Sequence, residues 1–307
     1  MKGFILAAGY GERLRPVTDV FPKPLVPVAN VPSICYAISI LARAGISSVI
    51  INLHYRSDKI REFFDGHDNF GLDISFSYEP KILGTGGGVM KCREMIGGDD
   101  FVLINSDVIM DMDLAAVLRR HRERTSPGTV VLYRATDAAS IGQVGVREER
   151  VIDFKNFLGT NVLSGLIYAG AAVLSPAIFQ YLEDGFSSIV YTGYTGLIVN
   201  RRLDYVEHDG LWLDIGTVAS LREASMRTAA TGMAQAVAAI CGLESAPVAS
   251  DAQIAAGAVV RDSIIGAGSI VGADAEVLDS LLLPGSRVEA GARISRAVVL
   301  REEIIRP

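Results

Sequence analysis

Basic residues, glycines and prolines cluster near the start of the chain in a pattern that could bind an anion. Gly9 and Gly11 follow the apolar run FILAA, Arg13 comes two residues later, and Lys23 stands between two prolines in FPKPLVPV. Glycines let backbone amides approach an anion closely, and the fixed φ angles of proline limit the movement of Lys23. An ammonium in an apolar stretch is costly without a counter-charge. The pattern predicts a phosphate-binding loop.

Two aspartates follow apolar runs further along the chain. Asp107 ends FVLINSD and Asp214 ends LWLD. At the carboxyl ends of parallel strands such side chains face the ligand crevice, and their oxygens suit Mg²⁺, which takes its other ligands from water and phosphate. An aspartate at a strand end is more often a turn or cap residue, so these two residues alone leave both interpretations open.

A second glycine cluster, GTGGGV at 84–89, follows EPKIL and precedes the helix-like VMKCREMI. Glycines before a helix N-terminus could bind phosphate, and a flexible hinge is the alternative. Neither glycine cluster is a P-loop, because GK[ST] is missing. The first also lacks the last glycine of the dinucleotide fingerprint, where Leu14 stands.

Alternating apolar runs and amphipathic segments up to about Arg134 predict a mostly parallel sheet with helices on both faces. Between Thr129 and Val206 the runs are shorter, and we interpret them as partly antiparallel strands that supply a second wall. Residues 217–243 have the composition of one long helix. We expect a catalytic domain at 1–228, a helical linker at 229–247 and a third domain at 248–307.

The last part of the chain repeats an apolar residue every five to seven positions, with small residues between. This period predicts a parallel β-helix of about three coils, and an ordinary run of short strands is the alternative. The residues expected to point inward are Ile254, Val260, Ile265, Ile270, Val277, Leu282, Val288, Ile294 and Val299.

Composition narrows the classes of protein. The 307 residues carry a formal net charge of -6, which argues against a nucleic-acid binder. Three cysteines without a CxxC pair suit free buried thiols in a reducing compartment. The first apolar run is too short for a secretory signal, and no run could span a membrane. We therefore expect a cytoplasmic protein with neither nucleic-acid nor membrane partners.

LAAGYGERLRPVT followed by FPKPLVPV is similar to the GxGxR and PKP motif of the sugar-1-phosphate nucleotidyltransferases, the nucleotide-sugar pyrophosphorylases. The resemblance continues through EPKILGTGGG, FVLINSDV, AGAAVLSP and LWLDIGT in the family's order, and several branches carry a hexapeptide-like tail. It implies a Rossmann-like α/β domain with a mixed, mostly parallel sheet, followed by a short left-handed parallel β-helix.

The resemblance also implies a reaction and its residues. A sugar 1-phosphate attacks the α-phosphorus of a nucleoside triphosphate and releases pyrophosphate, with Mg²⁺ as cofactor. Arg13, Lys23 and Asp107 would be catalytic, and Asp107 and Asp214 would hold the metal. The residues expected to bind the nucleotide are Leu6, Ala7, Ala8, Gly9, Gly11, Glu79, Gly84, Thr85 and Gly86.

The sugar side departs from the family pattern. Many relatives have Glu-Lys-Pro where this chain reads VIDFKNFLG, so Lys155 is a shifted substitute, and Tyr168 replaces a common asparagine. Gly145 is a third expected sugar contact. GTGGG and SGLIY resemble the branch that makes UDP-activated N-acetylmuramic acid, whereas NSDVI and the tail resemble mannose-1-phosphate guanylyltransferases. We expect the guanylyltransferase activity first. A uridylyltransferase acting on N-acetylmuramate 1-phosphate or glucose 1-phosphate is the alternative.

Three other classes compete with this interpretation. A β-helix acyltransferase would need a histidine base, yet no histidine follows His208. A nicotinamide oxidoreductase would need an acidic residue about 20 positions after its glycines, where this chain has PKPLVPV. A regulatory subunit without activity stays open, although Arg13, Lys23, Asp107 and Asp214 together argue against it. The β-helix is then expected to serve regulation or homo-oligomer formation.

Overall fold

The structure is a computed structural model that describes residues 1–306, and the chain folds into two units that are each discontinuous in sequence. The first, here the sheet unit, comprises Met1–Gly9 and Ile40–Trp212. The second, the β-helix unit, comprises Tyr10–Ser39 and the chain from Leu213 onward. The boundary between them passes through α2 (Ser33–Arg43) and β13 (Trp212–Asp214). The three sequential domains expected from composition remain a prediction.

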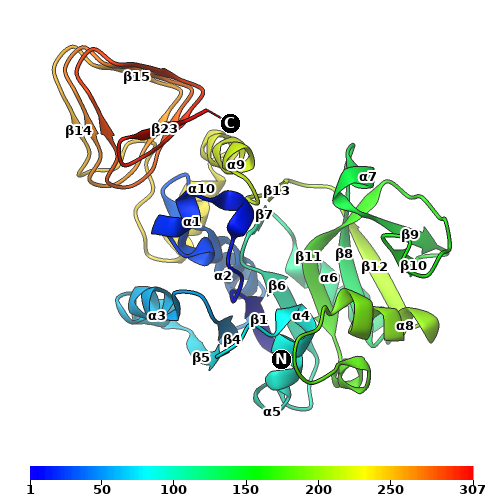
Figure 1. Ribbon diagram of the computed structural model, residues 1–307. Coiled ribbons are helices and arrows are strands. Elements are labelled where there is room, and N and C mark those ends of the chain that lie inside the picture. The colour runs from blue at the N-terminus through cyan, green and yellow to red at the C-terminus, as the bar shows by residue number, and fades with distance from the viewer. Residues whose placement is uncertain (307) are drawn as a thin grey trace. The chain divides into compact units, whose positions relative to one another are not determined.

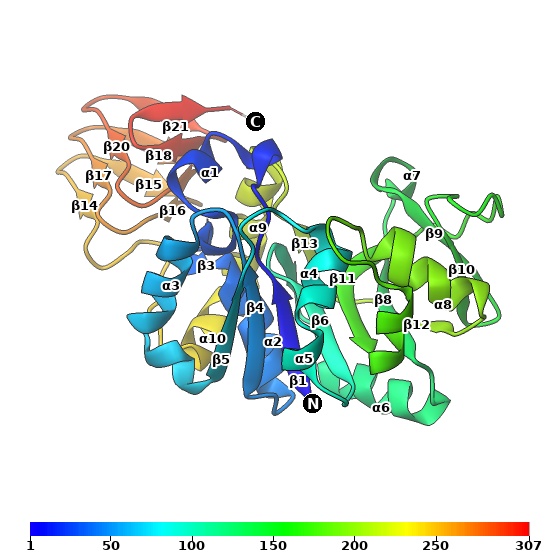
Figure 2. The same cartoon turned by 60° about the horizontal axis from the view of Figure 1, so that its bottom comes forward.

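The apolar runs of the sheet unit form one nine-stranded mixed sheet, which confirms the predicted fold class. Its order is β5-β4-β1-β6-β11-β8-β12-β10-β9, and the part from β5 to β12 can be followed from left to right in Figure 2. The first four strands are parallel, β11 runs antiparallel to both its neighbours, and β12 is parallel to β8. In chain order they are β1 (Lys2–Leu6), β4 (Ser48–Leu53), β5 (Asp73–Tyr78), β6 (Phe101–Asn105), β8 (Gly128–Arg134), β9 (Gln143–Arg147), β10 (Arg150–Phe154), β11 (Leu166–Leu174) and β12 (Leu203–His208).

The strands after Thr129 are partly antiparallel, as predicted, and belong to the same sheet. β11 pairs with β6 and with β8, and β8 pairs with β12, so the less regular segment extends the first sheet. Its role as a second wall stays a prediction. Periodicity gave the correct strands, but pairing between distant strands depends on tertiary contacts that it does not contain.

Helices follow where capping signals and amphipathic patterns predict them. Asp113 caps α6 by accepting a hydrogen bond from the amide of Ala116 at 3.1 Å, and the helix ends at Thr125 in the left-handed conformation. The helices and the short strand of this unit are α3 (Ser57–Asp65), α4 (Gly84–Lys91), α5 (Arg93–Ile96), α6 (Leu114–Arg124), α7 (Ala138–Ile141), α8 (Thr195–Val199) and β7 (Val108–Met110).

The β-helix unit begins with irregular chain, because its prolines and glycines delay the first long helix until Ser33. Its N-terminal elements are η1 (Glu12–Leu14), α1 (Val17–Val20), η2 (Lys23–Leu25), β2 (Pro27–Val28) and β3 (Val31–Pro32). The single long helix predicted at 217–243 is instead two helices, α9 (Val218–Ala230) and α10 (Met233–Ile240). Gly232 separates them with φ of 74°, a left-handed conformation that glycine adopts without strain.

The end of the chain forms the predicted left-handed parallel β-helix, and its three faces make a triangular prism in Figure 1. The strands are β14 (Gln253–Ile254), β15 (Val259–Arg261), β16 (Ile264–Ile265), β17 (Ile270–Val271), β18 (Glu276–Leu278), β19 (Leu281–Leu282), β20 (Arg287–Val288), β21 (Arg293–Ser295), β22 (Val298–Leu300) and β23 (Glu303–Ile305). β23 pairs antiparallel with β22.

Each coil of the prism contains 17 residues, because Gln253 pairs with Ile270 and Ile270 pairs with Arg287. The shortened corner is turned by Asp262, Asp279 and Arg296, each at positive φ. Serines stack beside this corner: the Ser263 hydroxyl accepts from the amide of Ser280 at 3.1 Å. Such ladders satisfy backbone groups that the turns leave unpaired.

The interior of the prism confirms most of the predicted inward positions. Ile265, Val277 and Leu282 are fully buried, and Val288, Ile294 and Val299 join the same cluster. Two expectations were wrong. Val271 rather than its neighbour Ile270 points inward, and Ile254 in the first coil is 41% exposed. A shift of one residue moves a side chain to the other face of a strand, and the first coil has a neighbour on one side only.

Two further observations concern the chain as a whole. Cys35, Cys92 and Cys241 are buried free thiols, as the sequence predicted. Among residues 1–306 we find no helix with both the length and the apolar character of a membrane span.

Candidate active site

The first glycine loop closes on itself within the β-helix unit. Gly11 has φ of 70°, and its carbonyl accepts a 2.9 Å hydrogen bond from the Thr18 hydroxyl. A Cβ at Gly11 would lie 2.8 Å from Thr18 and 3.2 Å from Lys23. The glycine is therefore required both by its backbone conformation and by the close packing of Lys23 across the loop.

Lys23 and Arg13 line one pocket, and the Asp214 carboxylate lies beside it at Gly216. The Ser33 hydroxyl lies 3.1 Å from the carbonyl oxygen of Lys23, which anchors the proline segment to the start of α2. Beside Lys23 is a pocket of about 320 Å³. A Cβ at Gly216 would lie 2.9 Å from both an Arg13 guanidinium nitrogen and an Asp214 carboxylate oxygen, so these two side chains converge there. The pocket is lined by Tyr10, Gly11, Glu12, Arg13, Lys23 and Gly216.

In the sheet unit, the buried side chains of Asn52 and Glu79, here the polar bracket, hold the backbone just after β1. Asn52, 1% exposed, accepts a hydrogen bond from the amide of Ala7 at 2.8 Å and donates to Glu79 Oε1 at 2.8 Å. The other Glu79 oxygen accepts from the amide of Leu83 at 2.8 Å. Glu79 thus fixes the backbone at Leu83, immediately before the second glycine cluster. Its direct contact with a nucleotide remains a prediction, as do the contacts expected of Leu6, Ala7, Ala8 and Gly9.

The second glycine cluster does not precede a helix but forms the first turns of α4. A Cβ at Gly88 would lie 2.8 Å from Glu79 Oε1, so the bracket packs directly against the helix backbone. The opposite side of the cluster is covered by residues 184–194, here the strap. The amide of Gly86 donates to the carbonyl of Ser187 at 2.9 Å, and the Thr85 hydroxyl accepts from the amide of Ile189 at 2.9 Å. Close packing explains the glycines here, and nucleotide binding by Gly84, Thr85 and Gly86 stays a prediction.

The two predicted metal ligands belong to different units. Asp107 is half-buried in the turn between β6 and β7, where the Ser106 hydroxyl donates to the carbonyl of Leu6 at 2.7 Å. Asp214 is half-buried at the end of β13, in the β-helix unit. Residues 1–306 contain no group of three metal-binding side chains. Each carboxylate by itself is the kind of ligand that Mg²⁺ uses, because the ion binds through one or two carboxylates and completes its shell with water and substrate phosphates. Metal binding by Asp107 and Asp214 stays a prediction.

Of the predicted sugar contacts, Tyr168 and Gly145 have structural partners. The Tyr168 hydroxyl lies 3.0 Å from that of Tyr194, and burial raises the pKa of both phenols. A Cβ at Gly145 would lie 3.1 Å from the carbonyl oxygen of Val162, so the glycine admits the chain that crosses β9. Sugar binding by Tyr168 and Gly145 stays a prediction.

Lys155 begins a turn at residues 155–161, which is organised by Asp153. We call it the acceptor loop, after the sugar contact that the sequence predicts for Lys155. This aspartate is 1% exposed and accepts three hydrogen bonds, from the amide of Leu158 at 3.0 Å and from the amide and hydroxyl of Thr160 at 3.0 and 2.8 Å. Lys155 itself is exposed, with φ of 53°. Its aliphatic stem packs over Gly142, and its amide donates to the carbonyl of Gln143 at 2.9 Å.

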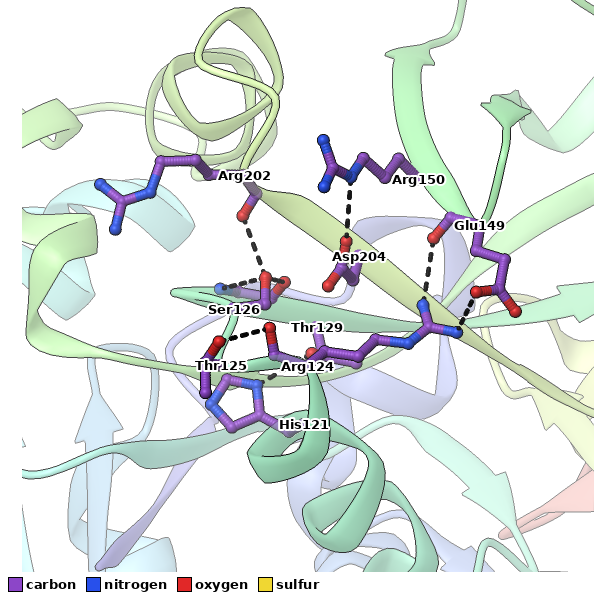
Figure 3. Close-up of polar contacts among 10 residues, drawn as sticks. His121, Arg124, Thr125, Ser126, Thr129, Glu149, Arg150, Arg202 and Asp204 are labelled. Atoms are coloured by element: carbon purple, nitrogen blue, oxygen red, sulfur yellow. Dashed lines mark hydrogen bonds and ion pairs between the residues drawn. The ribbon is translucent and has the colours of Figure 1, made fainter.

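The hairpin β9–β10, which carries Gly145 and leads into the acceptor loop, is clamped at its turn by ion pairs (Figure 3). Arg124 from α6 donates to the Glu149 carbonyl at 3.2 Å and approaches its carboxylate at 3.0 Å. Arg150 pairs with Asp204 of β12 at 3.7 Å. These contacts hold the hairpin against α6 and β12.

Sequence reasoning did not find Asn52, Asp153 or the strap. The signal for the first two was present: each is a polar residue within an apolar strand run, SVIINL and RVIDF. A polar side chain at such a position is buried and must find hydrogen-bond partners. The strap had no local signal, because its role comes from contacts with residues about 100 positions away.

The fold and these motifs identify the class of protein. Residues 2–231 match the family model described as Nucleotidyl transferase, and residues 234–307 match the model described as GlmU-like, C-terminal hexapeptide. The chain belongs to the nucleotidyl transferase family.

Some of its relatives are named as mannose-1-phosphate guanylyltransferases, and one is named as an N-acetylmuramate alpha-1-phosphate uridylyltransferase. A probable mannose-1-phosphate guanylyltransferase of rice, Oryza sativa, is 30% identical over 98% of this chain and 81% of its own length. The N-acetylmuramate alpha-1-phosphate uridylyltransferase of Neisseria meningitidis is 31% identical over 73% of this chain and 96% of its own. The match to the guanyltransferase of Hypocrea jecorina, 29% identical over 70% of this chain, spans 61% of that protein.

A solved structure supports the same fold assignment. A Bacillus anthracis protein crystallised in complex with sucrose superposes with a TM-score of 0.67 at 26% identity, over 73% of this chain and 94% of its own.

Proposed function

We propose that the protein transfers a nucleotidyl group from a nucleoside triphosphate to a sugar 1-phosphate, which gives a nucleoside diphosphate sugar and pyrophosphate. The observation that carries this proposal is the pocket lined by Gly11, Arg13 and Lys23, in which two cations and a glycine loop face one cavity. Membership in the nucleotidyl transferase family and the names of its relatives support the same reaction.

The chemistry joins two polyanions, so charge neutralisation and positioning have to lower the barrier. In the proposed step an oxygen of the sugar phosphate attacks the α-phosphorus in line. A new P–O bond forms as the bond to the pyrophosphate oxygen breaks, and pyrophosphate leaves with the electron pair. Arg13 binds the departing pyrophosphate, Lys23 contacts the reacting phosphates, and the amides around Gly11 orient the triphosphate.

We assign Mg²⁺ to Asp107 and Asp214 because each half-buried carboxylate offers hard oxygen donors at a strand end. When bound, the ion neutralises phosphate charge and polarises the phosphoryl group that is attacked. The two aspartates would hold the ion, and their removal should weaken that neutralisation.

Two substrate pairs are candidates. Mannose 1-phosphate with GTP comes first, because the rice guanylyltransferase matches nearly the whole chain, tail included. N-acetylmuramate 1-phosphate with UTP is the second, because the neisserial relative is matched over nearly its whole length. The segment VIDFKNFLG, which leads into the acceptor loop, departs from the Glu-Lys-Pro pattern of many relatives.

The test is a pyrophosphate-release screen of the purified protein with Mg²⁺, in which GTP, UTP, ATP and dTTP are each combined with a panel of sugar 1-phosphates. We expect turnover for one nucleotide with one or a few sugars. No release above the background of sugar-free controls, across the whole panel, would contradict the proposal.

A substitution in the same assay tests the metal assignment. Asp107→Asn should lower kcat by about a hundredfold or more, because a neutral amide is a poor Mg²⁺ ligand and leaves phosphate charge uncompensated. Asp251→Asn, an exposed aspartate of the β-helix unit, is the matched control. Unchanged turnover of the Asp107 variant would remove Asp107 from the site.

A further inference from the structure

The proline segment that carries Lys23 continues into a tight hairpin. β2 and β3 pair antiparallel around a tip of two residues, Ala29 and Asn30, whose φ angles are 50° and 64°. A two-residue turn with both residues in the left-handed region matches the twist of the paired strands. Asparagine adopts that conformation more readily than most other residues. The backbone of the tip is therefore well defined, and the Asn30 side chain is available for contacts outside the hairpin.

The tip is fastened to the chain that leads into the β-helix. Asn30 Nδ2 donates to the carbonyl oxygens of Ala246 and Ile265, at 2.9 and 3.0 Å. The Ser245 hydroxyl donates to the carbonyl oxygen of Ala29 at 3.2 Å. Ile265 belongs to β16 and is fully buried in the core of the prism. Three hydrogen bonds from two side chains thus hold the tip on a firmly packed support.

The base of the same hairpin is held by the start of α2. The Ser33 hydroxyl lies 3.1 Å from the carbonyl oxygen of Lys23 and 3.0 Å from that of Pro24. The buried Tyr36 hydroxyl donates to the carbonyl of Val28 at 2.9 Å. The hairpin is therefore held at its base by α2 and at its tip by the β-helix end of the chain.

Stiff backbone connects the tip to Lys23. Pro22, Pro24 and Pro27 each fix one backbone torsion. The turn η2 between them is closed by a hydrogen bond from the amide of Leu25 to the carbonyl of Pro22 at 2.8 Å. A displacement of the tip should therefore move Lys23, because the intervening residues have little freedom to absorb it.

We propose that Asn30 is a positioning residue for Lys23: by holding the hairpin tip to the β-helix end of the chain, it keeps the Lys23 ammonium in the orientation that the reacting phosphates require. The inference rests on the proposed function. A misplacement of about 1 Å can cost a rate factor of about 10². Substrate binding draws on many other groups, so the loss of this support should lower kcat more than it raises KM.

Asn30→Gly tests the proposal, because glycine keeps the left-handed turn without strain and removes the side-chain donors. We expect kcat to fall about tenfold, with the KM of both substrates changed by less than about twofold. In a Lys23→Ala background the same substitution should cause no further loss, because Asn30 acts through Lys23. The matched control is Asn69→Gly, which replaces an asparagine with φ of 51° in η3 (Asp68–Gly71) of the sheet unit and should leave kcat unchanged.

Hydrogen exchange provides a readout that does not depend on turnover. In Asn30→Gly the amides of Leu25 and Val26, which close η2, should exchange severalfold faster than in the wild type. The amides of α9 should keep their protection, whereas general destabilisation would raise exchange in both places. Unchanged exchange in η2, or a loss of kcat that adds fully to that of Lys23→Ala, would overturn the inference. A wild type that turns over no sugar 1-phosphate would overturn the proposed function instead, and the exchange rates would still decide whether Asn30 holds the Lys23 segment.

Discussion

At the residue scale, the proposed chemistry depends on a few charged side chains whose positions the surrounding backbone determines. Lys23 packs against Gly11, and Arg13 converges with Asp214 at Gly216. Each glycine is needed because a side chain there would displace the charged group beside it. The sequence identified the charged residues by their type and context, whereas the reason for Gly216 emerged only from the packing.

Replacing either cation should affect catalysis far more than folding. We expect Arg13→Ala and Lys23→Ala each to lower kcat by about 10²–10³-fold, because in the proposed mechanism each removes a charge that stabilises the transition state. Steady-state kinetics with saturating nucleotide measure the effect. The control is Lys59→Ala, which removes only an exposed ion pair with Glu62 at 2.8 Å. If the Lys23 variant matched this control, Lys23 would not contact the reacting phosphates.

The buried side chain of His121 predicts that the free energy of unfolding depends on pH. His121 is 3% exposed, its Nδ1 lies 2.8 Å from the Thr129 hydroxyl, and burial lowers its pKa despite the nearby Asp100. Folding therefore favours the neutral imidazole, and the unfolded chain binds the proton more tightly. The free energy of unfolding should fall as pH drops below the ordinary histidine pKa of about 6.5. Urea titrations between pH 5 and 8 measure this slope. His121→Gln should flatten it, and an unchanged slope would assign the dependence to other groups.

At the scale of elements, strands and helices were predictable where one residue pattern persisted. The alternation of apolar runs gave β1, β4 and β6, and the six-residue period gave the β-helix. The break at Gly232 was missed because helix composition continues on both sides of it, and only its positive φ stops the helix. The 17-residue coil was missed because one corner is shortened by a left-handed residue, which a simple period does not contain.

The acceptor loop is the element whose conformation a single residue controls. Asp153→Ala should leave the amides of Leu158 and Thr160 without their acceptor. It should cost about 1–3 kcal/mol in the free energy of unfolding. We also expect the KM of the sugar 1-phosphate to rise severalfold with a smaller change in kcat, because the loop is proposed to bind the sugar 1-phosphate without touching the reacting atoms. Asp153→Asn, which keeps one acceptor oxygen, should recover part of the KM. Equal losses in KM and kcat for both variants would indicate general damage to the fold.

At the scale of the whole molecule, the division of the chain follows contacts rather than sequence order. The N-terminal residues 10–39 belong with the β-helix unit, where the Asn30 side chain donates to the carbonyls of Ala246 and Ile265 at 2.9 and 3.0 Å. Such pairings over more than 200 positions leave no local trace in the sequence. The two family models nevertheless match residues 2–231 and 234–307. The class of reaction could therefore be predicted from motifs in the sequence, whereas the packing of distant segments could not.

The β-helix gives a prediction for assembly. Its flat faces are suited to stacking against a second copy, so light scattering of the intact chain should give a multiple of the monomer mass. A chain that ends at Val248 should lose that assembly more than it loses turnover per folded molecule, with circular dichroism as the check on folding. A monomeric mass for the intact chain at micromolar concentration would contradict an assembly role.

The most direct test of the account follows the α-phosphoryl group itself. With α-labelled nucleoside triphosphate, Mg²⁺ and a sugar 1-phosphate identified by the screen, one turnover should place the label in a nucleoside diphosphate sugar and release one equivalent of pyrophosphate. Omitting the sugar 1-phosphate should abolish both products. Label recovered as nucleoside monophosphate, or pyrophosphate released equally well without the sugar, would show hydrolysis instead of transfer and contradict the central claim.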